Sequence, residues 1–206
     1  MSQTPQQSLA DMCALHDVRL PDGYMPNPEA HLGNPRDAGH YEYALAWLKA
    51  KGATTVLDVG CYDGWLDFLL SSQGYKVSGY ELITELAEAA RRYAARNFID
   101  YTVTVGPALD IDVQQKYDAI LCFETLEHMA LYDACLCVKK FMGMARNGIL
   151  ISLPDQDCKQ NAQHKYTPTE ELIRFTWGDL PGFKMDYKVW DKRIPGNWFI
   201  EVDGKA

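Results

Sequence analysis

The chain has 206 residues, of which 47% are hydrophobic and 23% charged, and its formal net charge is −8. This composition suits one compact domain with a full core, and the acidic balance argues against a protein that grips nucleic acid through its overall charge. The sequence contains no run of about 18 apolar residues that could span a bilayer, so we expect no membrane association. Its six cysteines form no CxxC pair, which is typical of a reduced cytoplasmic protein.

Residues 1–36 show no clear hydrophobic period and carry five scattered prolines, so we expect an irregular N-terminal arm. Residues 37–51 follow as an amphipathic helix, with Tyr41, Leu45 and Leu48 on one face. Gly52 is expected to end this helix as a C-cap. The pattern therefore places a boundary between residues 36 and 37.

An apolar, β-branched run over residues 54–57 predicts a buried parallel strand. The strand leads through Asp58 and Val59 into a turn that contains Gly60 and Gly64, and a helical pattern begins directly afterwards. This order of strand, glycine turn and helix is the first half of a βαβ unit, which binds a ligand across the carboxyl end of its first strand.

The residues of this turn indicate which ligand fits. A pyrophosphate needs the Gly-x-Gly-x-x-Gly spacing, but Tyr62 stands in the place of the second glycine. Asp58 and Asp63 add two carboxylates, which disfavour a phosphate at close range. S-adenosylmethionine (SAM) carries a positive amino group and a positive sulfonium, and it suits the same loop. Asp63 is equally explained as a helix N-cap.

The run from Asp58 to Gly64 resembles motif I of the class I SAM-dependent methyltransferases, with Tyr62 departing from the usual middle glycine. The resemblance implies a three-layer, doubly wound α/β fold, with a mostly parallel seven-stranded sheet that contains one antiparallel strand. It implies an arm or lid over residues 1–36 and a SAM-binding domain over residues 37–206. Within residues 37–64, the resemblance places Tyr41, Asp58, Gly60, Cys61, Tyr62 and Gly64 at the cofactor.

A second strand over residues 75–80 ends at Glu81, which lies 23 residues past Asp58. An acidic residue at this position is expected to accept hydrogen bonds from the ribose hydroxyls. Leu82 would then flank the adenine. A helix over residues 84–97 and a third strand over residues 101–105 complete this half of the sheet.

The loop after the third strand departs from the family pattern. Many relatives place an acidic residue directly after its glycine to hold the adenine amino group, and this chain has Pro107 there. The contact then passes either to the backbone near Ala108 or to Asp110.

A fourth strand over residues 117–122 precedes Phe123, Glu124, Glu127 and His128. The Glu-x-x-Glu-His spacing resembles the motif after strand four in methyltransferases that include the ubiquinone-pathway O-methyltransferases. Because strand ends in an open α/β sheet face the crevice, we expect Phe123 beside the cofactor and the charged groups near the transferring methyl.

Histidine is the natural base for a hydroxyl or an amine, so His128 is the first candidate for the catalytic base and His164 the second, with Glu124 beside them. A sharper hypothesis joins Glu124, Glu127, His128 and His164 as a divalent-metal site for Mg, Mn, Fe or Zn. Small-RNA 3′-end 2′-O-methyltransferases look similar at these residues. The alternative is that both glutamates cap a helix N-terminus while His128 packs.

The last third of the chain predicts a helix over residues 130–146, a fifth strand over residues 149–154 and a polar loop over residues 155–165. Thr167 and Pro168 predict the start of another helix, with Pro168 at its first position. A hairpin over residues 182–191 and 197–202 closes the sheet.

These patterns favour a SAM-dependent methyltransferase that moves a methyl group to an oxygen or nitrogen of a small-molecule acceptor. Two alternatives stay open. One is a metal-assisted RNA ribose 2′-O-methyltransferase, and the other is a SAM-binding interaction protein without turnover, which Tyr62 and Pro107 keep possible.

Overall fold

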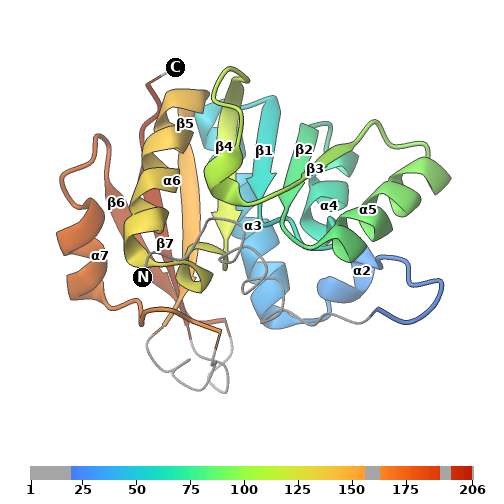
Figure 1. The fold of residues 1–206 in the computed structure, drawn as a ribbon, viewed down its shortest axis with the longest axis horizontal. Helices are drawn as coiled ribbons and strands as arrows, with labels where there is room; N and C mark the ends of the chain where they lie inside the picture. The colour runs from blue at the N-terminus through green and yellow to red at the C-terminus, as the bar shows by residue number, and fades with distance from the viewer. Residues whose placement is uncertain (1–19, 156–162, 191–195, 206) are drawn as a thin grey trace, which may run out of the picture.

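The computed structural model describes residues 20–155, 163–190 and 196–205 as an α/β sandwich (Figure 1). Seven strands form one sheet in the order β3-β2-β1-β4-β5-β7-β6. All neighbouring pairs are parallel except β5 with β7 and β6 with β7, so β7 is the single antiparallel strand. This sheet confirms the predicted fold class.

The strands are β1 (Thr55–Val59), β2 (Lys76–Glu81), β3 (Thr102–Val105), β4 (Tyr117–Phe123), β5 (Ala145–Pro154), β6 (Lys184–Lys188) and β7 (Asn197–Val202). The α-helices are α2 (Pro28–His31), α3 (Pro35–Lys51), α4 (Trp65–Ser72), α5 (Thr84–Arg96), α6 (Leu131–Met144) and α7 (Glu170–Trp177). Two short 3-10 helices are η1 (Ala108–Asp110) and η2 (Leu126–His128). None of the helices in the described residues combines the length and apolar character needed to cross a bilayer.

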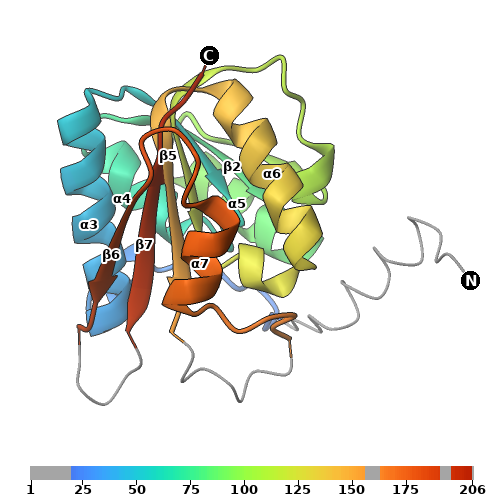
Figure 2. The same cartoon turned by 90° about the vertical axis from the view of Figure 1, so that its left-hand side faces the viewer.

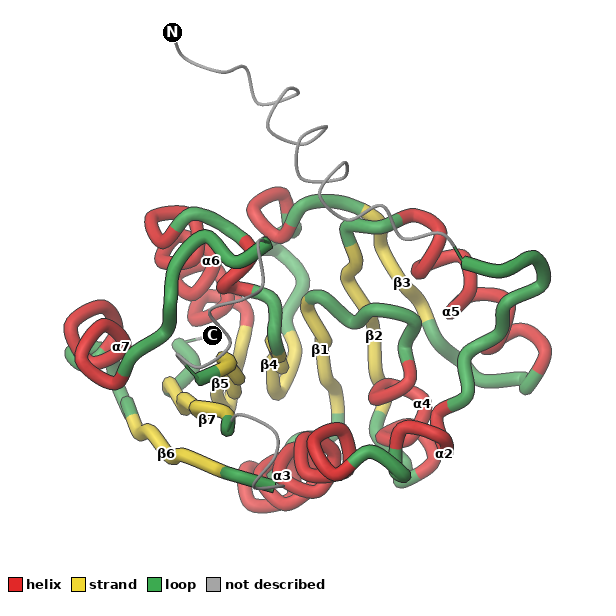
Figure 3. Tube along the Cα trace, turned by 90° about the horizontal axis from the view of Figure 1, so that it is seen from below, coloured by secondary structure: helices red, strands yellow, loops and turns green. Residues whose placement is uncertain are grey.

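Helices cover both faces of the sheet (Figures 2 and 3). Alternate residues of the central strands serve the two layers, as the period of two along a strand requires. In β4, Ala119 and Leu121 pack with α3 and α4, whereas Ile120 and Cys122 pack with α6 and α7. The sheet is thus covered on both faces, and β3 and β6 are its edge strands.

Of the element boundaries that differ from the predicted ones, three have a clear cause in the structure. Helix α3 begins at Pro35, because the side chain of Asn34 caps it by accepting the N–H of Arg36 at 2.9 Å. The arm boundary at residues 36 and 37 therefore falls inside the first turn of α3. Residues 1–19 of the arm lie outside the described part of the chain.

The other two differences lie in the second half of the chain. Helix α6 ends at Met144 and β5 begins at Ala145, because Ala145 already pairs with Tyr117 across an irregularity in β4. Helix α7 is capped by Thr169, whose Oγ1 accepts the N–H of Leu172 at 3.1 Å. Pro168 therefore precedes the helix and is not its first residue.

Candidate functional site

A cavity of about 350 Å³ lies at the carboxyl ends of β1, β2 and β4, the edge that faces the viewer in Figure 3. This volume is within the range of small-molecule sites. Seven of the residues predicted from the sequence line it: Gly60, Tyr62, Glu81, Leu82, Ala108, Glu124 and His128. Parallel strand ends converge here because every crossover returns the chain to the same edge.

The turn after β1 is shaped by backbone conformations that few residues tolerate. Gly60 has φ 78°, and a Cβ atom at this position would lie 2.0 Å from Thr125 Oγ1. Only glycine therefore allows the ends of β1 and β4 to approach this closely. Tyr62 has φ 55°, and its ring is 45% exposed beside the cavity. A bulky residue in the left-handed region is a strained feature that is found most often at functional sites.

Glu81, the last residue of β2, lines the cavity. Its Oε2 accepts the N–H of Tyr62 and its Oε1 accepts the N–H of Ile83, each at 2.8 Å. Burial raises the pKa of Glu81, while these N–H groups act in the opposite direction. A carboxylate held in this way presents its remaining lone pairs to the cavity.

The other carboxylates of the crossover do not line the cavity. Asp58 and Asp67 are both buried and share a hydrogen bond, and Asp67 also accepts the hydroxyl of Tyr101. Burial raises the pKa of Asp58 and of Asp67, which favours the protonated form of the pair.

Asp63 is engaged by the protein itself. One of its oxygens accepts the Tyr24 hydroxyl at 2.5 Å, and the other accepts the Trp65 N–H at 3.2 Å at the start of α4. The N-cap of α4 is Gly64, so Asp63 precedes the cap and is not the N-cap that the sequence suggested. Glu81 is left as the carboxylate that faces a ligand from this crossover.

Four predicted cofactor residues besides Asp58 are also not among the residues that line the cavity. Cys61 packs against Phe68 and Tyr101, and a Cβ atom added at Gly64 would lie 3.0 Å from the ring of Phe68. Phe123 contacts the rings of His40 and Phe199, with centroids 5.3 and 5.9 Å away. Tyr41 packs on the core between α3 and the sheet. These side chains support the site and do not line it.

Glu124 is half-buried and has φ 50°, another strained conformation at the cavity wall. Its Oε2 is paired with Arg36 Nη2, and its Oε1 accepts Asn197 Nδ2 at 2.7 Å and Ser152 Oγ at 3.1 Å. Both oxygens of Glu124 are therefore engaged by the protein itself. The prediction that Glu124 belongs to the metal-ligand set stays a prediction, and these contacts weigh against it.

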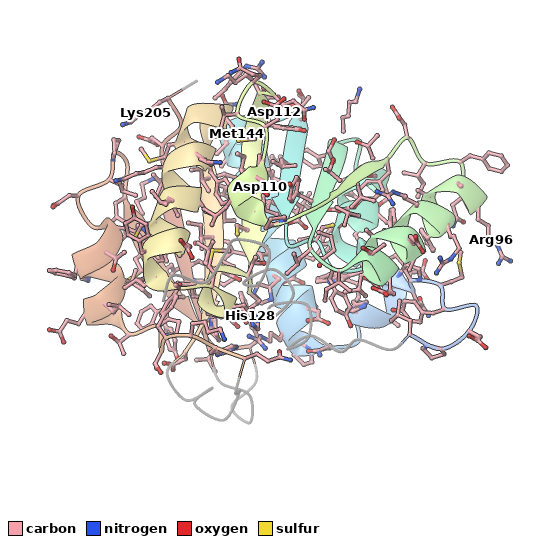
Figure 4. All side chains as sticks on the ribbon, in the orientation of Figure 1. Arg96, Asp110, Asp112, His128, Met144 and Lys205 are labelled. Atoms are coloured by element: carbon pink, nitrogen blue, oxygen red, sulfur yellow. The ribbon has the colours of Figure 1, made fainter. Side chains whose placement is uncertain are left out.

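Three other predicted residues do come together. Potential ligand atoms of Glu127, His128 and His164 all lie within 4.8 Å of one another. The imidazoles of His128 and His164 meet edge to face with centroids 5.0 Å apart, because the Lys165 N–H donates to the Glu127 carbonyl at 2.8 Å and holds the loop against η2. Figure 4 shows His128 at the carboxyl end of β4.

Glu127 has no hydrogen-bond partner for either carboxylate oxygen among the described residues, although its side chain is only 1% exposed. Its Oε1 lies 3.9 Å from His128 Nε2, too far for a hydrogen bond. Burial, followed by the charge of Glu124, raises the pKa of Glu127. Burial and the charge of Arg36 lower the pKa of His164. A buried, unpartnered carboxylate beside two imidazoles fits a divalent cation.

The sequence reasoning missed Arg36, Ser152 and Asn197. The sequence predicted Asn197 only as the first residue of a strand and Arg36 only as the last residue of the arm. The burial of Asn197, which requires polar partners for its amide, is known only from the fold.

Comparisons with known proteins bear on the family and the fold of the chain. A family model described as a methyltransferase domain matches residues 50–190. The ubiquinone biosynthesis O-methyltransferase of Xylella fastidiosa (strain M23) is 33% identical over 141 residues, which cover 66% of this chain and 56% of that protein. The corresponding protein of Xanthomonas axonopodis pv. citri (strain 306) is 32% identical over 140 residues, with 65% and 57% coverage. The chain thus spans little more than half the length of these relatives.

Solved structures share the fold. The magnesium protoporphyrin IX methyltransferase of Synechocystis PCC 6803 with bound SAH has a TM-score of 0.66 and 19% identity, covering 96% of this chain and 95% of that one. The small RNA methyltransferase HEN1 has a TM-score of 0.69 and 17% identity, covering 92% of this chain and 27% of that one. Family model, relatives and fold lead to one conclusion: the chain belongs to the methyltransferase-domain family of class I SAM-dependent methyltransferases.

Proposed function

We propose that this protein transfers the methyl group of SAM to an oxygen or nitrogen atom of a small-molecule acceptor. The observation that carries the proposal is that one cavity is lined both by Glu81, a carboxylate suited to ribose hydroxyls, and by His128, an imidazole suited to a proton. The ubiquinone biosynthesis O-methyltransferases that the chain resembles favour an oxygen acceptor.

The cofactor half of the cavity holds the methyl donor. Glu81 accepts the ribose hydroxyls, Leu82 and Ala108 flank the adenine, and Tyr62 covers the mouth of the cavity. The sulfonium is already an activated leaving group, so the enzyme mainly holds the acceptor in line with the methyl group.

The acceptor half supplies the proton chemistry. His128 takes the proton from the acceptor hydroxyl or amine as the new bond to the methyl group forms. His164 packs against His128, and its lowered pKa keeps its imidazole neutral at neutral pH. Either the two rings act as base and orienting group in this way, or they act as ligands of a cation.

As the alternative to a histidine base, we propose that Glu127, His128 and His164 hold a divalent cation beside the acceptor. The support is the orphaned carboxylate of Glu127, which lies next to two imidazoles in a geometry that permits shared coordination. When bound, such a cation lowers the pKa of a coordinated hydroxyl and so makes an oxygen acceptor nucleophilic.

Calorimetry and a methyl-transfer screen test the proposal. We expect heat on titration with SAM or with its product S-adenosylhomocysteine (SAH), and methyl transfer from labelled SAM to members of a panel of phenols and amines. Absence of SAH binding at millimolar concentration would refute the cofactor site. Transfer to short RNAs alone would favour the ribose alternative, and SAM binding without any transfer would favour a binding protein. Loss of transfer on chelation, restored by added metal, tests the cation.

A further inference from the structure

Arg36 ties the N-terminal helix α3 to the carboxyl ends of β4 and the start of β7. Its Nη2 donates to Glu124 Oε2 and its Nε donates to Asn197 Oδ1 at 3.1 Å. Asn197 Nδ2 in turn donates to Glu124 Oε1 at 2.7 Å. The three side chains therefore close a ring of hydrogen bonds, which is the pattern that the planar fork of an arginine makes possible.

The ring is held from outside as well. Asn34 caps α3 and accepts the N–H of Arg36 at 2.9 Å, which fixes the position of the arginine on the first turn. Asn197 and Ser152 are fully buried, and Ser152 donates to Glu124 Oε1 at 3.1 Å. Glu124 thus receives donors from Arg36, Asn197 and Ser152, and its carboxylate is satisfied without any ligand.

Glu127, three residues further along, is in the opposite state. Its carboxylate is fully buried and no described residue donates a hydrogen bond to it. Its ligand atom lies with those of His128 and His164 inside the 4.8 Å group, whereas Glu124 is not a member of that group. Of these two glutamates, Glu124 therefore has donors for both carboxylate oxygens, whereas Glu127 has none among the described residues.

We propose that Arg36 withholds Glu124 from the divalent cation, so that the cation is held by the three ligands Glu127, His128 and His164. This inference rests on the cation site of the proposed function. A site with three protein ligands keeps a coordination position open for a water or for the acceptor oxygen, whereas four ligands would close a tetrahedral site. The fixed positive charge of Arg36 also weakens the binding of a second cation nearby.

Titration of Mn²⁺, and separately of Zn²⁺, into the metal-free protein tests the inference by calorimetry. Arg36→Gln frees Oε2 of Glu124, while Asn197 and Ser152 still hold Oε1. We expect this variant to bind the cation about 10- to 100-fold more tightly than the wild type, the scale of effects from groups that surround a metal site. Glu124→Gln alone should change the affinity by less than about threefold, whereas Glu127→Gln should lower it by at least about tenfold. The double variant Arg36→Gln/Glu124→Gln should lose the gain.

Matched variants keep the outcome interpretable. Arg96→Gln, at the exposed end of α5 and remote from His128 in Figure 4, removes the same charge and should leave cation affinity unchanged. If Arg36→Gln does not fold, Arg36→Lys carries the test. A lysine keeps the charge but has no fork for both Glu124 and Asn197, so a smaller gain is expected.

Two results would overturn the inference. One is that Glu124→Gln weakens the cation as much as Glu127→Gln does, which would make Glu124 a ligand. The other is that neither Mn²⁺ nor Zn²⁺ binds to the wild type or to Arg36→Gln. In the second case, SAH titration of the same samples separates the two proposals, because retained SAH binding leaves the methyltransferase proposal standing.

Discussion

Glu81 and Glu124 occupy equivalent places in the two halves of the cavity, one ending β2 and the other directly following β4. Glu81 is held by backbone N–H groups 19 and 2 residues away in the chain. Glu124 is held by side chains 88, 73 and 28 residues away. The cofactor half is therefore built from neighbouring turns, and the acceptor half from segments that only the complete fold brings together.

This difference decides which residues each half depends on. A backbone N–H is present in every residue except proline, so the surroundings of Glu81 tolerate changes of side chain such as Tyr62 in place of glycine. The surroundings of Glu124 require the individual side chains of Arg36, Asn197 and Ser152. We expect the cofactor half to be robust to substitution and the acceptor half to be specific.

The largest effect on stability is expected at Gly60, which packs against Thr125. Gly60→Ala places a Cβ atom against Thr125 and also demands a positive φ. We expect the free energy of unfolding to fall by about 3–5 kcal/mol, the sum of left-handed strain and overpacking, which lowers Tm by roughly 10 °C. Thermal unfolding followed by circular dichroism measures it.

Gly52→Ala is the matched control, since Gly52 also has a positive φ of 62° but no atom within 4 Å of the added Cβ. It should show only the strain, about 1–2 kcal/mol. Equal losses of unfolding free energy in the two variants would mean that close packing against Thr125 does not require a glycine at position 60.

The second effect separates the two glutamates. Glu81→Ala removes the acceptor that faces the cavity and holds the Tyr62 and Ile83 N–H groups. We expect SAH to bind about 10- to 150-fold more weakly, which corresponds to about 1.5–3 kcal/mol for hydrogen bonds to a charged group. Glu124→Ala should lower Tm while leaving SAH affinity within about threefold. Similar losses of SAH affinity in both variants, measured by calorimetry, would erase the distinction between the halves.

The same contrast explains what the sequence could predict. Glu81 follows from a strand, a glycine turn and a fixed spacing, all of which are local patterns. The pairing of Arg36 with Asn197 spans 161 residues, and nothing at either position signals the other. Tyr41 and Phe123 were assigned to the cofactor because their elements reach the site, but the directions of their side chains depend on packing against Phe199 and its neighbours.

The third prediction concerns the pH dependence of stability and the buried pair of Asp58 on β1 and Asp67 on α4. Burial raises the pKa of Asp58 to about 7 and raises that of Asp67 as well, whereas both are near 4 in the unfolded chain. The folded protein therefore binds more protons than the unfolded chain between pH 4 and 7, so this contribution to stability is present below pH 4 and is lost as the pH rises through 7.

Asp67→Asn supplies a permanent donor to Asp58 and still accepts the Tyr101 hydroxyl. We expect its Tm at pH 8 to exceed that of the wild type by roughly 3–6 °C, or about 1–2 kcal/mol, and the gain to shrink at pH 5. Asp133→Asn on α6, which lies outside this pair, should show no such pH dependence. A gain that stays constant from pH 5 to pH 8 would contradict a shared proton.

The smallest effect compares two strained aromatic residues, one at the cavity and one remote from it. Tyr62 has φ 55° beside the cofactor half, and Phe98 has φ 56° after α5 with its ring 95% exposed. Substitution by glycine removes left-handed strain at both positions, partly offset by the backbone entropy of glycine, so Phe98→Gly should gain about 0.5–1 kcal/mol. Tyr62→Gly should gain less, because the ring also loses its partial burial. Only Tyr62→Gly should weaken SAH, by about two- to fivefold for the loss of a partly exposed ring contact. Because both variants relieve the same backbone strain, equal SAH affinities would show that the conformation of Tyr62 serves the turn alone, and that its ring does not take part in holding the cofactor.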